Sequence, residues 1–235
     1  MNLSDHLPQL TEDQIAQLNT LTDLFLETNK QINLSSIRDR DGVLIKHVVD
    51  SLLILPYLKL KAKDKVLDVG TGGGFPGLAL AIVYPEVHFT LLDATQKKIN
   101  AVQAMSDSLG LKNMETEWDR AEELAHEGDF RHQFDLVISR ALAHFGTNLE
   151  LCMPFVRPGG KFFAYQGPEM AEKWMNYNDM AKKLGGKLIS CHNTVLPVEE
   201  AKRCFIEVEQ TTACINSFPR PTSQIRKRPL EPETY

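Results

Sequence analysis

Apolar residues in the first part of the chain recur with helical spacing. From Ile15 to Phe25 they return every three or four residues, as on the buried face of an amphipathic helix. The preceding Thr11–Gln14 segment has the form of a capping box, with a hydroxyl at the cap and an amide three residues later. A second helical pattern runs from about Val43 to Leu55 and stops at Pro56. The sequence therefore predicts an N-terminal helical extension over residues 1–60, without strands.

The pattern then changes, and short apolar, β-branched runs alternate with helical stretches. The four runs predicted as strands are Val66–Val69, Phe89–Leu92, Leu136–Ser139 and Phe162–Tyr165. The clearest helical stretches are Thr95–Leu109 and Met170–Leu184. Two late runs, Lys187–Leu196 and Arg203–Thr211, have no helix between them and are predicted to pair as an antiparallel hairpin at the sheet edge. This alternation predicts a doubly wound, mostly parallel α/β sheet with helices on both faces.

The C-terminal residues have a composition of their own. The segment 218–232 contains four prolines and few apolar side chains, which predicts an extended and mobile conformation. Residues 213–235 carry four basic and two acidic side chains, whereas the net charge of the whole chain is −5. An acidic body with a basic tail indicates a local contact with an anion. We expect one structural domain, made of the extension, a core over residues 61–212 and this basic, proline-containing tail.

The overall composition is that of an ordinary globular protein. Hydrophobic residues make up 43% of the chain and charged residues 24%. No apolar run approaches the roughly 20 residues of a membrane span, and the N-terminus lacks the pattern of a secretory signal. The four cysteines are widely spaced and include no CxxC pair, so neither a metal site nor a disulfide framework is indicated. We therefore expect a cytoplasmic protein without membrane contact.

The most informative stretch is the glycine-rich segment that follows the first predicted strand. Four glycines, Gly70 and Gly72–Gly74, lie in this loop, and they permit a tight turn that a ligand can approach closely. In open α/β sheets this position, at the carboxyl end of the first strand, is where ligands bind. Asp93 ends the next strand, 21 residues after Gly72, and its carboxylate can accept hydrogen bonds from both hydroxyls of a ribose.

Three interpretations of this segment remain possible at this point. Gly72, Gly74 and Gly77 match the spacing of the dinucleotide fingerprint, which would indicate a nicotinamide cofactor. Asp68, just before the first glycine, is awkward beside a pyrophosphate but suits the ammonium of a methionine moiety, which favours S-adenosylmethionine. The third interpretation is a turn without a ligand.

Several motifs together resemble the RsmG (GidB) family of bacterial 16S ribosomal RNA guanine-N7 methyltransferases. They are Asn33–Ile37, His47–Leu52, Asp68–Gly77, Asp93 with Lys97 and Lys98, Arg120–Glu122, Ser139–Ala141, Phe218–Arg220 and Lys227–Leu230. These motifs span nearly the whole chain in the expected order. The resemblance implies a class I, Rossmann-like methyltransferase fold with a seven-stranded sheet and S-adenosylmethionine as cofactor. It also implies a monomer that methylates 16S ribosomal RNA, free or within the small subunit or its precursor.

The resemblance also assigns residues to the site. Together with the glycine-rich segment it predicts a cofactor site made of Asp68, Gly70, Gly72, Phe75, Asp93, Ala121, Glu122 and Arg140. The predicted RNA-binding residues are Lys97, Lys98, Arg120, Arg203, Arg220, Arg226, Lys227 and Arg228. Lys97 and Lys98 could equally form a solvated helix face. In two respects the chain departs from the family: Gln166 stands where a lysine is usual, and Ser223 and Ile225 replace a glycine and a proline in the tail.

Arg140 and His47 are the candidate catalytic residues. Arg140 directly follows a buried strand at the ligand-binding edge, where an unpaired guanidinium is costly unless it has a ligand or partner. His47 and Asp50 lie three apart on one helix face, which suits packing more than a metal or an acid–base pair, but the family places this motif near the active site. His144 follows a strand end and could approach the substrate.

Missing motifs also indicate the chemistry. The Asp/Asn-Pro-Pro-aromatic turn of amine methyltransferases is absent, because Ser139–Leu142 stands in its place. Cys152 is not in the Pro-Cys order of a pyrimidine C5 nucleophile. Guanine N7 needs neither device, since its lone pair can attack directly once base and methyl group are oriented. The alternatives are a nicotinamide-dependent oxidoreductase and, given Gln166, a non-catalytic RNA-binding protein of the same fold.

Overall fold

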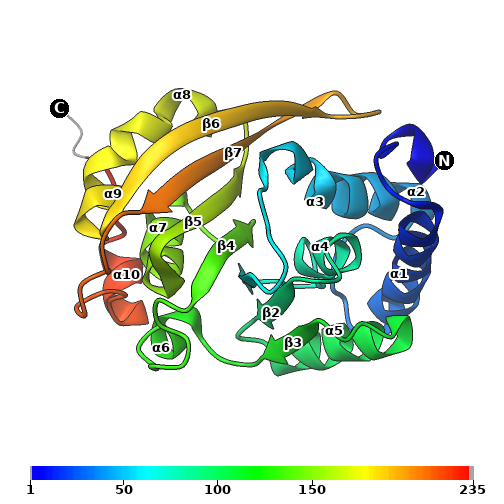
Figure 1. The fold of residues 1–235 in the computed structure, drawn as a ribbon, viewed down its shortest axis with the longest axis horizontal. Helices are drawn as coiled ribbons and strands as arrows, with labels where there is room; N and C mark the ends of the chain where they lie inside the picture. Colours follow the sequence, from blue (N-terminus) through cyan, green and yellow to red (C-terminus); the bar gives the residue numbers. More distant parts are fainter. Residues whose placement is uncertain (1, 233–235) are drawn as a thin grey trace.

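A seven-stranded sheet runs through the centre of the molecule (Figure 1). The computed structural model describes residues 2–232. The strands are β1 (Lys65–Val69), β2 (His88–Leu92), β3 (Met114–Glu117), β4 (Phe134–Arg140), β5 (Val156–Gln166), β6 (Gly186–Leu196) and β7 (Ala201–Gln210). Their order across the sheet is β3-β2-β1-β4-β5-β7-β6. β1 to β5 pair in parallel and β7 pairs antiparallel with both β5 and β6, so the predicted edge hairpin is confirmed.

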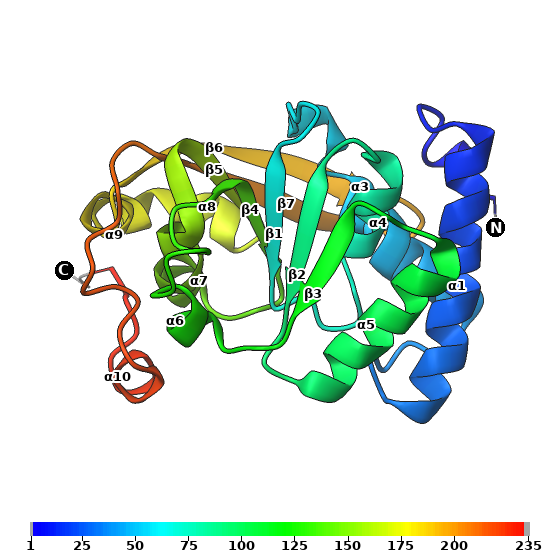
Figure 2. The ribbon, with the colours of Figure 1, turned by 60° about the horizontal axis from the view of Figure 1, so that its bottom comes forward.

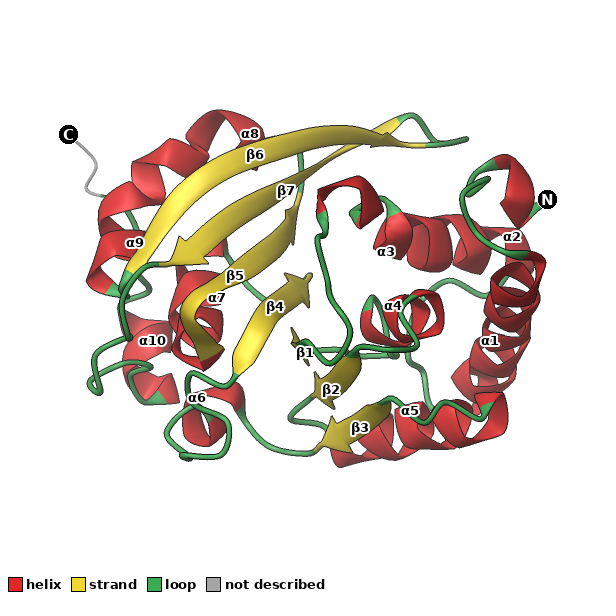
Figure 3. Cartoon of the chain, in the orientation of Figure 1, coloured by secondary structure: helices red, strands yellow, loops and turns green. Residues whose placement is uncertain are grey.

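Helices form a layer on each side of the sheet, as Figure 3 shows. One layer consists of α1 (Glu12–Gln31), α2 (Arg40–Val43), α3 (Asp50–Leu52), α4 (Gly77–Val83) and α5 (Gln96–Leu109). The other consists of α6 (Ala121–Leu124), α7 (Phe145–Cys152), α8 (Met170–Lys173), α9 (Asn178–Lys183) and α10 (Thr222–Lys227). Successive strand residues face opposite layers, so Val66 packs in one hydrophobic core and Leu67 in the other. The predicted doubly wound sheet with helices on both faces is confirmed.

The N-terminal extension is helical as predicted, and no strand occurs within residues 2–60. The capping box at Thr11 is present, since its hydroxyl accepts from the Gln14 amide and the Gln14 side chain accepts from the Thr11 amide. The buried face of α1 packs against α4 and α5 (Figure 2). The second helical stretch runs from α2 through a π-helical segment, Leu44–Val49, into α3. This extension therefore belongs to the same hydrophobic core as one face of the sheet.

Two elements differ from the sequence predictions. β3 was not predicted, because its sequence Met-Glu-Thr-Glu has no apolar alternation and an edge strand needs only one neighbour, here β2. The predicted helix Met170–Leu184 is interrupted by a 3-10 segment, Trp174–Tyr177. Among residues 2–232, no helix is both long enough and apolar enough to cross a membrane.

The prediction of an extended tail over residues 218–232 is wrong at residues 222–227. Part of it forms α10, and Ile225 is buried in the core beneath the second layer. Phe218 and Leu230 pack against the same core. The prolines of this segment do not prevent its apolar side chains from packing against the core. The last three residues, 233–235, lie outside the described part of the chain.

Candidate active site

The glycine-rich segment forms the wall of a cavity of about 340 Å³ at the carboxyl end of β1. Gly70 and Gly72 have φ angles of 76° and 59°, a left-handed conformation that favours glycine. A Cβ on Gly70 would lie 2.5 Å from the Cδ1 of Leu142, so this glycine is also required for close packing. A Cβ on Gly72 would have no neighbour closer than 3.9 Å. The backbone at Gly72 is therefore open to a ligand.

Asp93 lines this cavity and fixes the turn to the end of β2. Its Oδ2 accepts from the amide of Gly72 at 3.0 Å and its Oδ1 accepts from the amide of Thr95 at 2.8 Å. Each carboxylate oxygen has two acceptor positions, so capacity remains for the hydroxyls of a ligand. Asp93 thus lies where its carboxylate could accept hydrogen bonds from the ribose hydroxyls of a cofactor, as the sequence predicted.

Asp68 is completely buried beneath the turn and does not line this cavity. Its Oδ2 accepts from the amide of Gly77 at 2.9 Å, which holds the first residue of α4. Its Oδ1 has no hydrogen-bond partner among residues 2–232. Burial raises the pKa of the Asp68 carboxyl to about 6, although the hydrogen bond from Gly77 opposes the shift. Asp68 shapes the turn from below, and its contact with a methionine ammonium stays a prediction.

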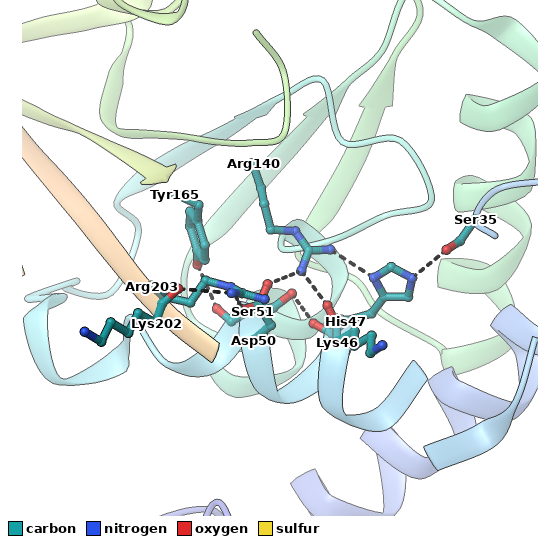
Figure 4. Close-up of polar contacts among 9 residues, drawn as sticks. All are labelled: Ser35, Lys46, His47, Asp50, Ser51, Arg140, Tyr165, Lys202 and Arg203. Atoms are coloured by element: carbon teal, nitrogen blue, oxygen red, sulfur yellow. Dashed lines mark hydrogen bonds and ion pairs between the residues drawn. The ribbon is translucent and has the colours of Figure 1, made fainter. Parts of the chain in front are cut away.

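Arg140 reaches from the end of β4 to the N-terminal extension (Figure 4). Its Nη1 donates to Asp50 Oδ2 at 2.9 Å and to the Lys46 carbonyl at 3.1 Å. The other oxygen of Asp50 accepts from Arg203 Nε at 2.8 Å. Asp50 therefore lies between two guanidinium groups from β4 and β7 and is itself only 6% exposed. The sequence did not indicate this role for Asp50.

His47 lies beside Arg140 and is shielded from solvent. Its ring stacks on Phe75 with centroids 5.3 Å apart, and its Nε2 is 3.0 Å from Ser35 Oγ. Burial lowers the pKa of His47 to about 4, and the positive charge of Arg140 lowers it further in the same direction. His47 is therefore neutral at physiological pH. Arg140 Nη2 lies 3.4 Å from His47 Nδ1, so the tautomer with its proton on Nε2, facing Ser35, lets Nδ1 accept from Arg140.

A second cavity of about 450 Å³ adjoins the first. Its lining includes Lys46, Asp50, Tyr165, Gln166, Arg203 and Phe205. The two cavities share His47, Arg140 and Ala141. Ala141 has a φ of 54°, an uncommon conformation for a residue with a Cβ, and such strain often marks functional turns. Two ligands held in the two cavities would thus meet at Arg140.

The remaining predicted residues lie on α5, at the start of α6, in the tail and before α7. Lys98 lines the first cavity, and Lys97 is exposed beside it on α5. Ala121 and Glu122 begin α6 and do not line the first cavity, and Glu122 accepts from Arg120 and Thr222. The exposed basic residues of the tail are Arg226, Lys227 and Arg228. Arg220, in contrast, is paired with Glu150, so a contact with RNA would compete with that pair. His144 is exposed and lines neither cavity.

Known proteins similar to this chain identify the family. Residues 14–200 match the family model described as GidB, rRNA small subunit methyltransferase G. The chain is 33% identical over 222 residues to the ribosomal RNA small subunit methyltransferase G of Alkaliphilus metalliredigens, covering 94% of this chain and 93% of that protein. It is 36% identical over 221 residues to the protein of that name from Lachnoclostridium phytofermentans, covering 94% and 91%. The chain belongs to this family.

The resemblance found in the sequence is thereby confirmed. The predicted activity, S-adenosylmethionine-dependent methylation of small-subunit ribosomal RNA, is confirmed with it. The fold agrees with it. A 16S rRNA (adenine(1408)-N(1))-methyltransferase from Catenulisporales acidiphilia superposes with a TM-score of 0.53 at 15% identity, covering 66% of this chain and 88% of that one. The first cavity fits the cofactor, because it combines open glycine backbone at Gly72 with the carboxylate of Asp93.

Proposed function

We propose that this enzyme transfers a methyl group to N7 of a guanine in 16S ribosomal RNA, with the cofactor in the 340 Å³ cavity and the guanine in the 450 Å³ cavity. The observation that carries this division is the junction formed by His47, Arg140 and Ala141, which both cavities share. We infer that the enzyme acts as a cytoplasmic monomer on RNA of the small subunit or its precursor.

In this proposal the residues of the protein bind the cofactor and the guanine, orient them and balance their charge. Bound S-adenosylmethionine supplies an electrophilic methyl group on a positively charged sulfur. The glycine turn and Asp93 would hold the cofactor, and Arg140, which lines both cavities, would orient both ligands. The N7 lone pair of guanine would form a bond to the methyl carbon as the bond from that carbon to sulfur breaks, which leaves a neutral thioether. No proton must leave the base first. Neutral His47 adds no charge beside the forming cationic ring, and Asp50 offsets part of the positive charge of its two arginines.

Arg203 provides donors for the RNA at the second cavity. Its Nε donates to Asp50 and its Nη1 to the Lys202 carbonyl. Its Nη2 donates no hydrogen bond to any of residues 2–232. It can therefore donate to the guanine O6 or to a flanking phosphate. Gln166 lines the same cavity with an amide that can both donate and accept. The loss of a lysine charge at this position therefore still leaves a group that can hydrogen-bond to a base.

Substituting Asp93 tests the cofactor site. The Asp93→Ala variant is expected to bind S-adenosylmethionine about 10- to 100-fold more weakly, because hydrogen bonds to a charged group each contribute roughly 1.5–3 kcal/mol. Isothermal titration calorimetry would measure the affinity, with thermal unfolding to verify the fold. Asp107→Ala, on the exposed side of α5, is the matched control. A folded Asp93→Ala variant with unchanged affinity would place the cofactor elsewhere.

Neutralising the exposed tail cluster tests the RNA contact. Changing Arg226, Lys227 and Arg228 together to alanine should leave cofactor affinity unchanged and weaken RNA binding. Each lost phosphate contact should reduce the magnitude of the log–log salt slope by about 0.7–0.9. The control is the triple alanine variant of three exposed lysines near the amino ends of the strands, Lys59 and Lys61 before β1 and Lys112 before β3. Equal salt slopes for the two triple variants would show that the tail does not bind the RNA backbone.

A further inference from the structure

The C-terminal segment Phe218–Leu230, here called the strap, is docked along the layer that contains α6 and α7 (Figure 1). Arg131 holds its beginning, with Nη1 donating to the Phe218 carbonyl at 3.0 Å. The carbonyl of Pro219 lies 3.0 Å from His126 Nε2. Ile225 is buried in the core of this layer. The strap is thus part of the fold along its length.

A buried ion pair fixes the middle of the strap. Glu150, in α7, is fully buried, and Arg220 binds it through its amide at 2.9 Å, its Nε at 2.7 Å and its Nη2 at 2.6 Å. Nη2 also donates to the carbonyl of Arg228, which ties the far end of α10 to the same point. Undocking the strap would leave a buried carboxylate without its partner, which is strongly unfavourable.

Two further contacts reach the first turns of α6 and α7. The hydroxyl of Thr222 donates to the carboxylate of Glu122, in the first turn of α6. At the other end, the carbonyl of Leu230 packs on Gly146, in the first turn of α7. A Cβ on Gly146 would lie only 1.6 Å from the Leu230 oxygen, so glycine alone permits this contact. The strap therefore spans the starts of two helices at the catalytic edge of the sheet.

These helix starts adjoin the proposed cofactor site. α7 follows the turn that carries Leu142, which lines the first cavity and covers Gly70. α6 follows β3, the strand next to the one that Asp93 ends. Burial alone would raise the pKa of the Glu122 carboxyl, but hydrogen bonds from Thr222 and Arg120 bring it below its ordinary value. Glu122 thus stays charged, which strengthens its hold on the strap.

We propose that the strap positions the cofactor site, so that docking of the strap and binding of the cofactor stabilise each other through the first turns of α6 and α7. Thr222 is the positioning residue on the α6 side. This inference rests on the proposed function, in which the cofactor occupies the first cavity, and on the prediction from the family resemblance that Ala121 and Glu122 contact the cofactor beyond it.

The first arm of the test measures affinity for S-adenosylhomocysteine, the unreactive product, by calorimetry. Thr222→Val removes the hydroxyl and keeps the shape, and it should weaken binding about fivefold or more, as for coupled sites in general. Thr222→Ser restores the hydroxyl and should restore the affinity. Ser223→Ala, at the adjacent exposed residue, is the control. Thermal unfolding verifies that each variant is folded.

The second arm uses reciprocity, which a merely structural role of the strap would not produce. If docking raises cofactor affinity, the cofactor must favour docking by the same factor. Saturating S-adenosylhomocysteine should therefore slow tryptic cleavage at Arg226 and Lys227 in the wild type, and much less in Thr222→Val. Equal affinities of the wild type and Thr222→Val for S-adenosylhomocysteine would overturn the coupling and leave the proposed function intact. A wild-type cleavage rate that the ligand does not change would do the same. A wild-type protein that does not bind S-adenosylhomocysteine would contradict both.

Discussion

The Asp50→Ala variant is expected to unfold more easily, by about 2–4 kcal/mol, and to lose at least about a hundredfold in methyl transfer. Asp50 accepts from both Arg140 and Arg203, whose side chains are 14% and 29% exposed. Removing it leaves two partly buried guanidinium groups without their carboxylate, and such groups repel each other. Arg140 would then leave the position at which it meets both cavities. Chemical denaturation and single-turnover methylation would measure the two effects.

A surface aspartate provides the control for this prediction. Asp23 pairs with Arg40, but its side chain is 63% exposed, so Asp23→Ala should cost less than about 1 kcal/mol and leave methyl transfer unchanged. Asp50→Asn should fall between the wild type and Asp50→Ala, because the amide still accepts one hydrogen bond. An Asp50→Ala variant with wild-type stability and rate would show that the two arginines do not depend on it.

The Arg140→Ala variant should lower the single-turnover rate about a hundredfold at every pH, because misplacing reactants by about 1 Å can cost that much. The profile of the wild type should be nearly flat from about pH 7 to 8.5, since N7 needs no general base. His47 cannot provide a rising limb there, because its pKa is lowered to about 4 and the ring is neutral throughout. Below pH 7 the Asp68 carboxyl, whose pKa is raised to about 6, begins to take up a proton.

The histidine variants separate this mechanism from one with a base. His47→Ala should lose stability through its contacts with Phe75 and Ser35, but the shape of its rate profile should match that of the wild type. His144→Ala should change neither. RNA must be saturating at each pH. A tenfold rise in rate per pH unit, abolished by removing one histidine, would falsify direct attack and indicate a nucleophile that must first lose a proton.

Much of the fold and of the cofactor site could be predicted from local sequence. A few adjacent residues are enough to predict the capping box at Thr11 and the strand before Gly70, because caps, turns and strand periodicity have local physical causes. The end of the next predicted strand then placed Asp93 at the same edge of the sheet. β3 was not predicted because its cause is not local. Its stability comes from pairing with β2, and its two glutamates face largely away from the core. Motifs shared with the family then identified the activity.

The tertiary structure alone decided which of these residues meet. Asp50 is separated from Arg140 by 90 residues and from Arg203 by 153, so no local pattern could indicate that one carboxylate joins both. The tail was predicted as extended, yet Arg220 pairs with the buried Glu150, 70 residues away in the sequence. The carbonyl of Leu230 packs on Gly146, where a side chain would block the contact. Sequence periodicity reports how each segment folds by itself. Long-range ion pairs and close backbone contacts depend on the path of the whole chain, and they complete this site.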